Sequence, residues 1–199
     1  MILPNQLTVM RIILTPVFFF LFLQESAIMQ QISVIVFLIA AITDWYDGWL
    51  ARKFNYITSW GKFMDPLADK ILTSAAFLGF VFLGILPGWM VYIIIIRDFL
   101  ITGLRSFAEL KKHSFYTSRS AKIKTFVQMF FLYYLLIIYV LRTFPSFIHE
   151  FEYYYKLFSD KSLIYYIMLF VTVFTAYTGF SYIYKNRFMI RELYAPKSK

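Results

Sequence analysis

Four aspartates between positions 44 and 69 are the residues best suited to chemistry in this chain. Asp44 and Asp47 are three residues apart and Asp65 and Asp69 are four apart, so each pair shares one helix face. The pairs lie at the ends of neighbouring apolar segments, so we expect them to face one cleft. Carboxylates about 5 Å apart repel each other by roughly 3 kcal/mol at an effective dielectric near 20. Such a cluster requires protons or hard divalent cations, and four carboxylates suit two Mg²⁺ or Mn²⁺ ions.

Small and basic residues accompany these carboxylates. Gly48 follows the second aspartate, and Gly61 lies four residues before Asp65 on the same helix face. Glycines leave room for a bulky ligand, and Arg52, one turn beyond Gly48, is suited to a phosphate oxygen. An alternative gives Asp65 a structural role, as the cap of a helix whose first turn contains Pro66.

A second candidate site consists of basic residues further along the chain. Arg97 and Asp98 interrupt a strongly apolar run, where an ionisable side chain is costly and marks a functional candidate. Arg105 follows about two helical turns later, and Lys122 lies beyond the next loop. We predict that Arg97, Arg105 and Lys122 converge on a phosphate-binding pocket near the aspartates. The alternative is that Arg97 pairs only with an acid and that the other two are orientation signals of a membrane protein.

Membrane helices must position these residues. Of the 199 residues, 60% are hydrophobic and 16% charged, whereas soluble domains are roughly 45–50% apolar and about 25% charged. Lipid must cover the excess apolar surface, so we predict one domain over residues 1–199, an all-α bundle of six transmembrane helices. The predicted spans are Leu7–Leu23, Ile32–Leu50, Leu67–Leu86, Trp89–Leu110, Ile123–Leu141 and Leu163–Tyr184.

The placement of charge predicts the orientation. Lys and Arg gather after the second and fourth predicted spans and in the C-terminal tail, whereas the other side carries few. The positive-inside rule then places both termini in the cytoplasm and the aspartates at the cytoplasmic ends of the second and third spans. The net charge of +9 therefore favours anionic lipid headgroups as partners over nucleic acid. The chain has no cysteine, which excludes thiolate metal sites, and the outer segment Arg142–Lys161 receives no predicted role.

The segment from Asp44 to Asp69 resembles the signature of the CDP-alcohol phosphatidyltransferase family, D-x₂-D-G-x₂-A-R-x₈-G-x₃-D-x₃-D, at every fixed position. The resemblance implies a six-span fold and a homodimer. It also implies transfer of a phosphatidyl group from a CDP-linked lipid to an alcohol, with release of CMP. The predicted cytoplasmic position suits an enzyme that joins a lipid to a water-soluble alcohol.

The resemblance assigns a role to each matched residue. Asp44, Asp47 and Asp65 would hold the metal ions. Asp69 would contribute to that site and act as the catalytic base that takes the proton from the attacking hydroxyl. The nucleotide site would be lined by Gly48, Arg52 and Gly61.

The first apolar segment extends the resemblance to the family's opening residues. Asn5, Thr8 and Arg11 follow one another at three-residue spacing, so one helix face carries an amide, a hydroxyl and a guanidinium. We expect this face to meet the diphosphate of the CDP-lipid. Alternatively, Arg11 extends to the cytoplasmic interface, as long basic side chains near helix ends do.

The acceptor alcohol is predicted from a narrower resemblance. The stretches RDFLITGLR (97–105) and KIKT (122–125) resemble family members that use sn-glycerol 3-phosphate, although Ala121 stands where glycine is expected. The implied reaction converts CDP-diacylglycerol and sn-glycerol 3-phosphate into phosphatidylglycerophosphate and CMP in the cell membrane. Inositol phosphate, serine and phosphatidylglycerol are alternative acceptors. An ion transporter or channel is the alternative from another class, disfavoured because the carboxylates lie at helix ends rather than at the membrane midplane.

Overall fold

The computed structural model describes the backbone of residues 3–54, 59–111 and 119–194. Within these ranges the side chains of residues 3–6, 44–45, 47–52, 54, 59–63, 109–110 and 192–194 are not described. The described backbone forms six long helices and three short ones, with no strand. The long helices are α1 (Leu3–Phe22), α2 (Ala27–Phe54), α3 (Ser59–Phe82), α4 (Gly88–Leu110), α5 (Arg119–Leu141) and α8 (Lys161–Lys185). The short helices are α6 (Pro145–Glu150), α7 (Glu152–Phe158) and α9 (Arg187–Tyr194).

The six long helices coincide with the six predicted apolar segments, and α3 shows the largest difference. It begins at Ser59 rather than at Leu67, because helical structure continues beyond the apolar stretch into the preceding polar residues. Pro66 therefore lies inside α3, where a proline removes one backbone hydrogen bond without ending the helix. The alternative in which Asp65 caps the start of this helix is wrong.

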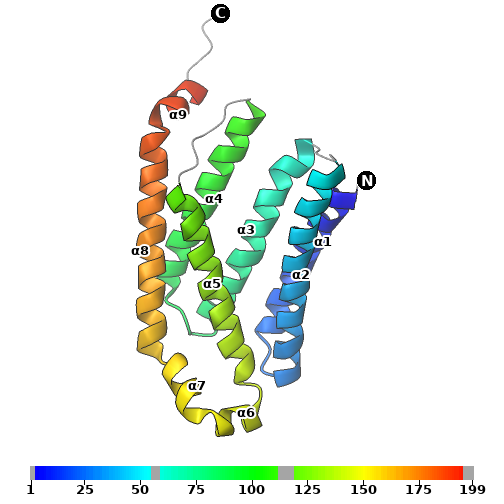
Figure 1. Cartoon of the computed structure of the whole chain (residues 1–199), viewed down its shortest axis with the longest axis vertical. Helices are drawn as coiled ribbons and strands as arrows, with labels where there is room; N and C mark the ends of the chain where they lie inside the picture. Colours follow the sequence, from blue (N-terminus) through cyan, green and yellow to red (C-terminus); the bar gives the residue numbers. More distant parts are fainter. Residues whose placement is uncertain (1–2, 55–58, 112–118, 195–199) are drawn as a thin grey trace, which may run out of the picture.

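The long helices run side by side and form one bundle (Figure 1). Helix α1 packs against both α2 and α3, and α2 and α3 make a smaller contact with each other. Helix α3 packs on α4, α4 on α8, and α8 on α5, while α5 also meets α2. The start of α1 and the short helix α9 lie at one end of the bundle, and α6 and α7 close the other end (Figure 1).

Aromatic side chains fill the core of the bundle. The Phe22 ring lies 4.3 Å from the Tyr139 ring and 5.1 Å from the Phe80 ring, measured between centroids. The Tyr139 hydroxyl donates a hydrogen bond of 2.6 Å to the Phe22 carbonyl, which ties α5 to the end of α1. A Cβ atom at Gly79 would lie 2.6 Å from the Phe22 ring. Glycine at this position therefore permits the close approach of α1 and α3.

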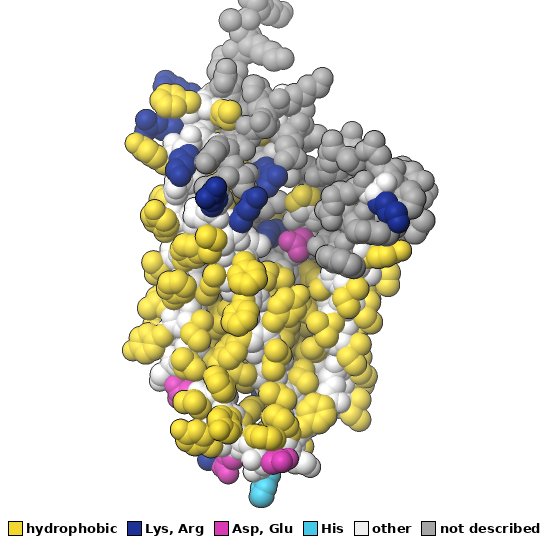
Figure 2. Space-filling view, in the orientation of Figure 1, with side chains coloured by type: hydrophobic (Ala, Val, Ile, Leu, Met, Phe, Trp, Pro, Cys, Tyr) yellow, Lys and Arg dark blue, Asp and Glu magenta, His cyan; other side chains and the backbone are white. Residues whose placement is uncertain are grey.

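The outer surface of the bundle is apolar, as lipid contact requires. Large side chains such as Phe20, Phe126 and Phe180 are 68–76% exposed. Figure 2 shows a broad hydrophobic band, with most visible Lys and Arg side chains gathered toward the end that carries α9. Within the described residues, two helical stretches satisfy the length and hydropathy criteria for a membrane span, and two further apolar helices are shorter. The two stretches that satisfy both criteria are Arg119–Leu141 and Glu152–Lys185. The two shorter apolar helices are Leu7–Phe22 and Ala27–Thr43.

Candidate active site

Asp65 and Asp69 lie one turn apart on α3, and α1 contacts the first of them. The Thr8 hydroxyl donates a hydrogen bond of 2.5 Å to Oδ1 of Asp65. Thr8 is fully buried, and its bond orients the carboxylate in the way that outer-shell partners orient metal ligands. Arg11, one turn further along α1, is also fully buried. That burial contradicts the alternative in which Arg11 extends to the membrane interface.

The other aspartates of the predicted cluster lie on α2, and their side chains are outside the described residues. These are Asp44 and Asp47. The same holds for the remaining predicted nucleotide-site residues, Asn5, Gly48, Arg52 and Gly61. Among the described side chains, no three from His, Cys, Asp and Glu gather in one place. The convergence of four carboxylates therefore stays a prediction, although the aspartate oxygens are ligands of the type that Mg²⁺ and Mn²⁺ prefer.

A cavity of about 560 Å³ lies beside Asp69, between α3, α4, α5 and α8. The three basic residues that the sequence predicts to converge, Arg97, Arg105 and Lys122, all line it. Lys70 contributes a fourth cation, and Asp69 is the one acid among the described lining residues. The rest of the lining consists of Pro66, Ile101, Thr102, Ser106, Ala121, Thr125 and Tyr182. The structure thus places a strongly basic pocket against the candidate base.

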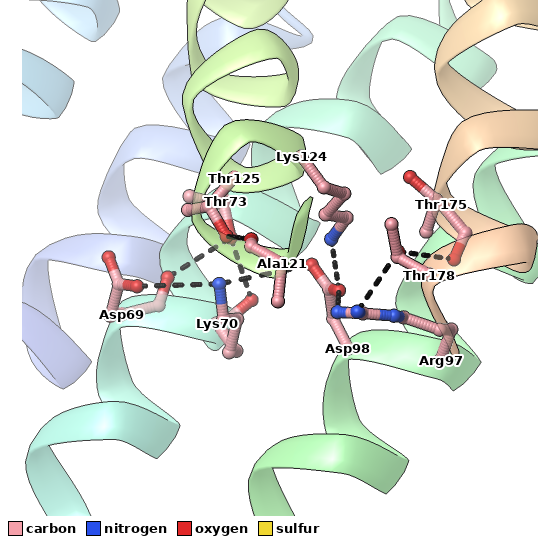
Figure 3. A network of polar contacts seen from close by, with 10 residues as sticks. All are labelled: Asp69, Lys70, Thr73, Arg97, Asp98, Ala121, Lys124, Thr125, Thr175 and Thr178. Atoms are coloured by element: carbon pink, nitrogen blue, oxygen red, sulfur yellow. Dashed lines mark hydrogen bonds and ion pairs between the residues drawn. The ribbon is translucent and has the colours of Figure 1, made fainter. Parts of the chain in front are cut away.

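The buried carboxylate of Asp98 lies behind this pocket and contacts cations from three helices (Figure 3). The side chain of Asp98 is 3% exposed, and its Oδ1 accepts hydrogen bonds from Arg97 Nη1, at 3.0 Å, and from the buried Lys124 Nζ. The Lys70 ammonium lies 3.8 Å from Oδ2 of Asp98 and 3.7 Å from Oδ2 of Asp69. One carboxylate therefore joins cations from α3, α4 and α5, which meets the requirement that buried charges be paired.

Arg97 is further held by α8. Its Nη2 donates a hydrogen bond of 3.1 Å to the Thr178 hydroxyl, which donates in turn to the Thr175 carbonyl at 2.9 Å. A Cβ atom at Gly179 would lie 2.9 Å from Cγ of Arg97, so glycine gives the arginine the space it occupies. Arg97 thus pairs with Asp98 and also lines the cavity, which combines features of the two readings that the sequence allowed.

Sequence reasoning did not assign Lys70 and Lys124 to the site. Lys122 and Lys124 are two residues apart on α5, so they point to different sides of the helix. Lys122 is exposed at the cavity, whereas the side chain of Lys124 is 1% exposed. The available signal was Asp98 itself, an acid within the apolar run of the fourth predicted span, because a buried carboxylate requires cationic partners.

Comparison with known families agrees with this geometry. The family model for CDP-alcohol phosphatidyltransferases matches residues 1–177, so the chain belongs to the CDP-alcohol phosphatidyltransferase family. The match confirms the resemblance found in the aspartate segment.

Individual relatives narrow the comparison to enzymes named CDP-diacylglycerol–glycerol-3-phosphate 3-phosphatidyltransferase. The chain is 42% identical to the Rickettsia typhi enzyme over 130 residues, which cover 65% of this chain and 73% of that protein. It is 40% identical to the Bacillus subtilis enzyme over 139 residues, covering 64% and 72% of the two chains. It is also 40% identical to the Salmonella typhimurium enzyme over 139 residues, covering 67% and 75%.

Proposed function

We propose that this chain is a membrane enzyme that transfers the phosphatidyl group of CDP-diacylglycerol to sn-glycerol 3-phosphate. The products are phosphatidylglycerophosphate and CMP. The observation that carries the proposal is the cavity in which Asp69 faces Arg97, Arg105 and Lys122. An acceptor with both a phosphate and a hydroxyl suits such a cavity, and the names of the relatives specify glycerol 3-phosphate for those proteins.

The chain's own residues divide the chemistry between binding and proton transfer. Arg97, Arg105 and Lys122 bind the acceptor phosphate, as arginine and lysine do at anionic sites. Asp69, whose side chain is 38% exposed, takes the proton of the acceptor hydroxyl. The hydroxyl oxygen forms a bond to the phosphorus that carries the diacylglycerol. The bond from this phosphorus to the bridging oxygen breaks, and CMP leaves with the electron pair.

The proposed cofactor is a pair of Mg²⁺ or Mn²⁺ ions held by Asp44, Asp47, Asp65 and Asp69. Such ions, when bound, neutralise the diphosphate and stabilise the CMP leaving group. The hydrogen bond from Thr8 to one oxygen of Asp65 supports this assignment, because it orients the carboxylate and leaves its second oxygen for a ligand. The CDP moiety then lies between the starts of α1 and α3 and the end of α2, against Asn5, Thr8, Gly48, Arg52 and Gly61.

The proposed topology has six spans, formed by α1 to α5 and α8, with both termini in the cytoplasm. The gathering of Lys and Arg toward the end that carries α9 (Figure 2) supports this orientation under the positive-inside rule. The active site then opens to the inner leaflet, where a lipid substrate and a soluble acceptor meet. A homodimer in the cell membrane completes the proposal and rests on family membership alone.

An acceptor panel tests the proposal directly. Purified enzyme with Mg²⁺ and CDP-diacylglycerol receives glycerol 3-phosphate, inositol phosphate, serine or phosphatidylglycerol, and CMP release is measured. We expect rapid release with glycerol 3-phosphate, because the basic cavity selects a small phosphorylated alcohol. Equal or faster release with another acceptor would reject the choice of substrate, and ion flux in liposomes without CMP release would favour a transporter.

A further inference from the structure

A second cavity, of about 490 Å³, lies toward the end of the bundle that carries α6 and α7, away from Asp69. It is bounded by the turn between α3 and α4, the end of α5, α7 and the start of α8. Apolar side chains form most of its wall, including Phe80, Leu135, Ile138 and Ile164. Tyr165 also lines it and is 40% exposed, so the cavity opens toward the outer, lipid-facing surface of the bundle.

The cavity is positively charged. Arg142 and Lys161 line it, and its described lining contains no acid. Neither residue takes part in an ion pair within the described part of the chain. The Arg142 guanidinium lies 4.6 Å from the centre of the Tyr139 ring and donates a long bond of 3.4 Å to the Gln30 amide oxygen. Both cations therefore retain donors for an anion.

Two acids near this cavity, Asp160 and Glu152, make contacts of their own. The Asp160 carboxylate caps α8 by accepting a hydrogen bond of 2.9 Å from the Leu163 amide. Glu152 pairs with Lys156 one turn along α7, at 2.5 Å. Arg142 and Lys161 thus have no carboxylate partner among the described residues, which makes an anionic ligand complementary to the cavity lining.

The wall formed by α7 is tied to α5 and is flanked by exposed aromatic side chains. The Tyr134 hydroxyl on α5 donates a hydrogen bond to the Phe158 carbonyl at the end of α7. Aromatic side chains on α6, on α7 and between them face outward: Phe147, Phe151, Tyr153 and Tyr154 are all exposed. Exposed aromatic residues beside basic ones are typical of the membrane–water interface, the depth at which phospholipid phosphates lie.

We propose that this cavity binds one anionic phospholipid of the outer leaflet. The lipid phosphate lies between Arg142 and Lys161, and the acyl chains leave past Tyr165 along the apolar surface. A small hydrophilic anion would match the two cations but not the wall of Phe80, Leu135 and Ile138. A phospholipid matches both, because its charged headgroup continues into apolar chains.

The test compares two lysines at the same end of the bundle. Lys161→Gln, Arg142→Gln/Lys161→Gln and the matched control Lys156→Gln are purified in nanodiscs of phosphatidylcholine containing a minor fraction of phosphatidylglycerol. Native mass spectrometry then counts the phosphatidylglycerol that stays bound to each protein. Each basic side chain beside an anionic headgroup contributes about fivefold in affinity, so the double variant should lose about 30-fold and the control little.

Two outcomes would overturn the proposal. One is retention of phosphatidylglycerol by the double variant at the wild-type level, or an equal loss in Lys156→Gln, which would indicate an unspecific charge effect. The other is displacement of the bound lipid by excess inorganic phosphate, which would identify a small-anion site instead. Thermal unfolding of each variant checks the fold, and a folded Lys161→Gln protein alone suffices if the double variant does not fold.

Discussion

The basic cavity beside Asp69 and the basic cavity at the far end of the bundle hold their cations differently. Near Asp69, two of the lining cations contact the buried Asp98: Arg97 donates a hydrogen bond to it and the Lys70 ammonium lies 3.8 Å from it. At the far end, Arg142 and Lys161 meet no carboxylate within the described structure. Fixed charges need little reorganisation when a substrate arrives, which favours catalysis. Cations without a carboxylate partner, such as Arg142 and Lys161, can move to meet a lipid headgroup, and binding of the proposed lipid does not require them to be held in one geometry.

The largest expected effect comes from replacing Asp69, because only the first of the two cavities has a carboxylate in its described lining. Asp69→Asn removes the proposed base, so turnover should fall by about 10²–10⁴-fold at saturating Mg²⁺, while folding and binding of CDP-diacylglycerol persist. CMP release and a CDP-lipid binding assay measure the two properties. Glu152→Gln makes the same chemical change at the far end and should leave turnover unchanged. Turnover of Asp69→Asn near the wild-type level would exclude Asp69 as the base.

The next effect concerns the anchoring of the cations. Asp98→Asn leaves Arg97 and the buried Lys124 without a countercharge, and breaking a buried ion pair costs about 3–5 kcal/mol. The double variant Asp98→Asn/Lys124→Gln also removes the more deeply buried of these two cations and should regain part of that stability. Chemical unfolding in detergent measures both proteins, and the KM for glycerol 3-phosphate should rise in each. A double variant as unstable as Asp98→Asn would show that the ion pair is not what holds this wall.

A smaller effect is expected from displacing Arg97 without changing any charge. In Gly179→Ala the added methyl group meets Cγ of Arg97 at 2.9 Å, so the arginine must shift. The KM for glycerol 3-phosphate should rise several-fold with little change in kcat, as expected when ground-state and transition-state binding weaken equally. Gly103→Ala on α4 is the matched control, because its Cβ would meet nothing within 4 Å. Equal KM values for the two variants would show that the position of Arg97 does not affect binding of the acceptor.

The sequence predicted the long helices well because each is an apolar run that ends in polar or turn residues. It missed the early start of α3, where Pro66 gave a false signal for a helix terminus. It also missed α6, α7 and α9, because helices of six to eight residues are too short to show a span. Local pattern alone does not reveal such pieces, whose position depends on tertiary contacts such as the bond between Tyr134 and Phe158.

The candidate site was predictable where residues share one helix face. Arg97 and Arg105 are eight residues apart on α4, and both line the cavity beside Asp69. The contacts of Asp98 with Lys70 and Lys124 were not predictable, because they depend on how α3 and α5 pack against α4. Spacing along one helix is encoded locally, whereas a meeting of three helices is decided by the packing of the whole bundle.

Helices α1 and α3 touch at two points, and the same number of residues separates these points on each helix. Thr8 bonds Asp65 and Phe22 packs against Gly79, and the separations, 22 − 8 and 79 − 65, are both 14 residues. The helices are therefore parallel and in register over about 21 Å at 1.5 Å per residue. Neither helix can slide along the other without disturbing both contacts. A bulkier residue in place of Gly79 would thus alter the alignment of Asp65, a proposed metal ligand about 21 Å away.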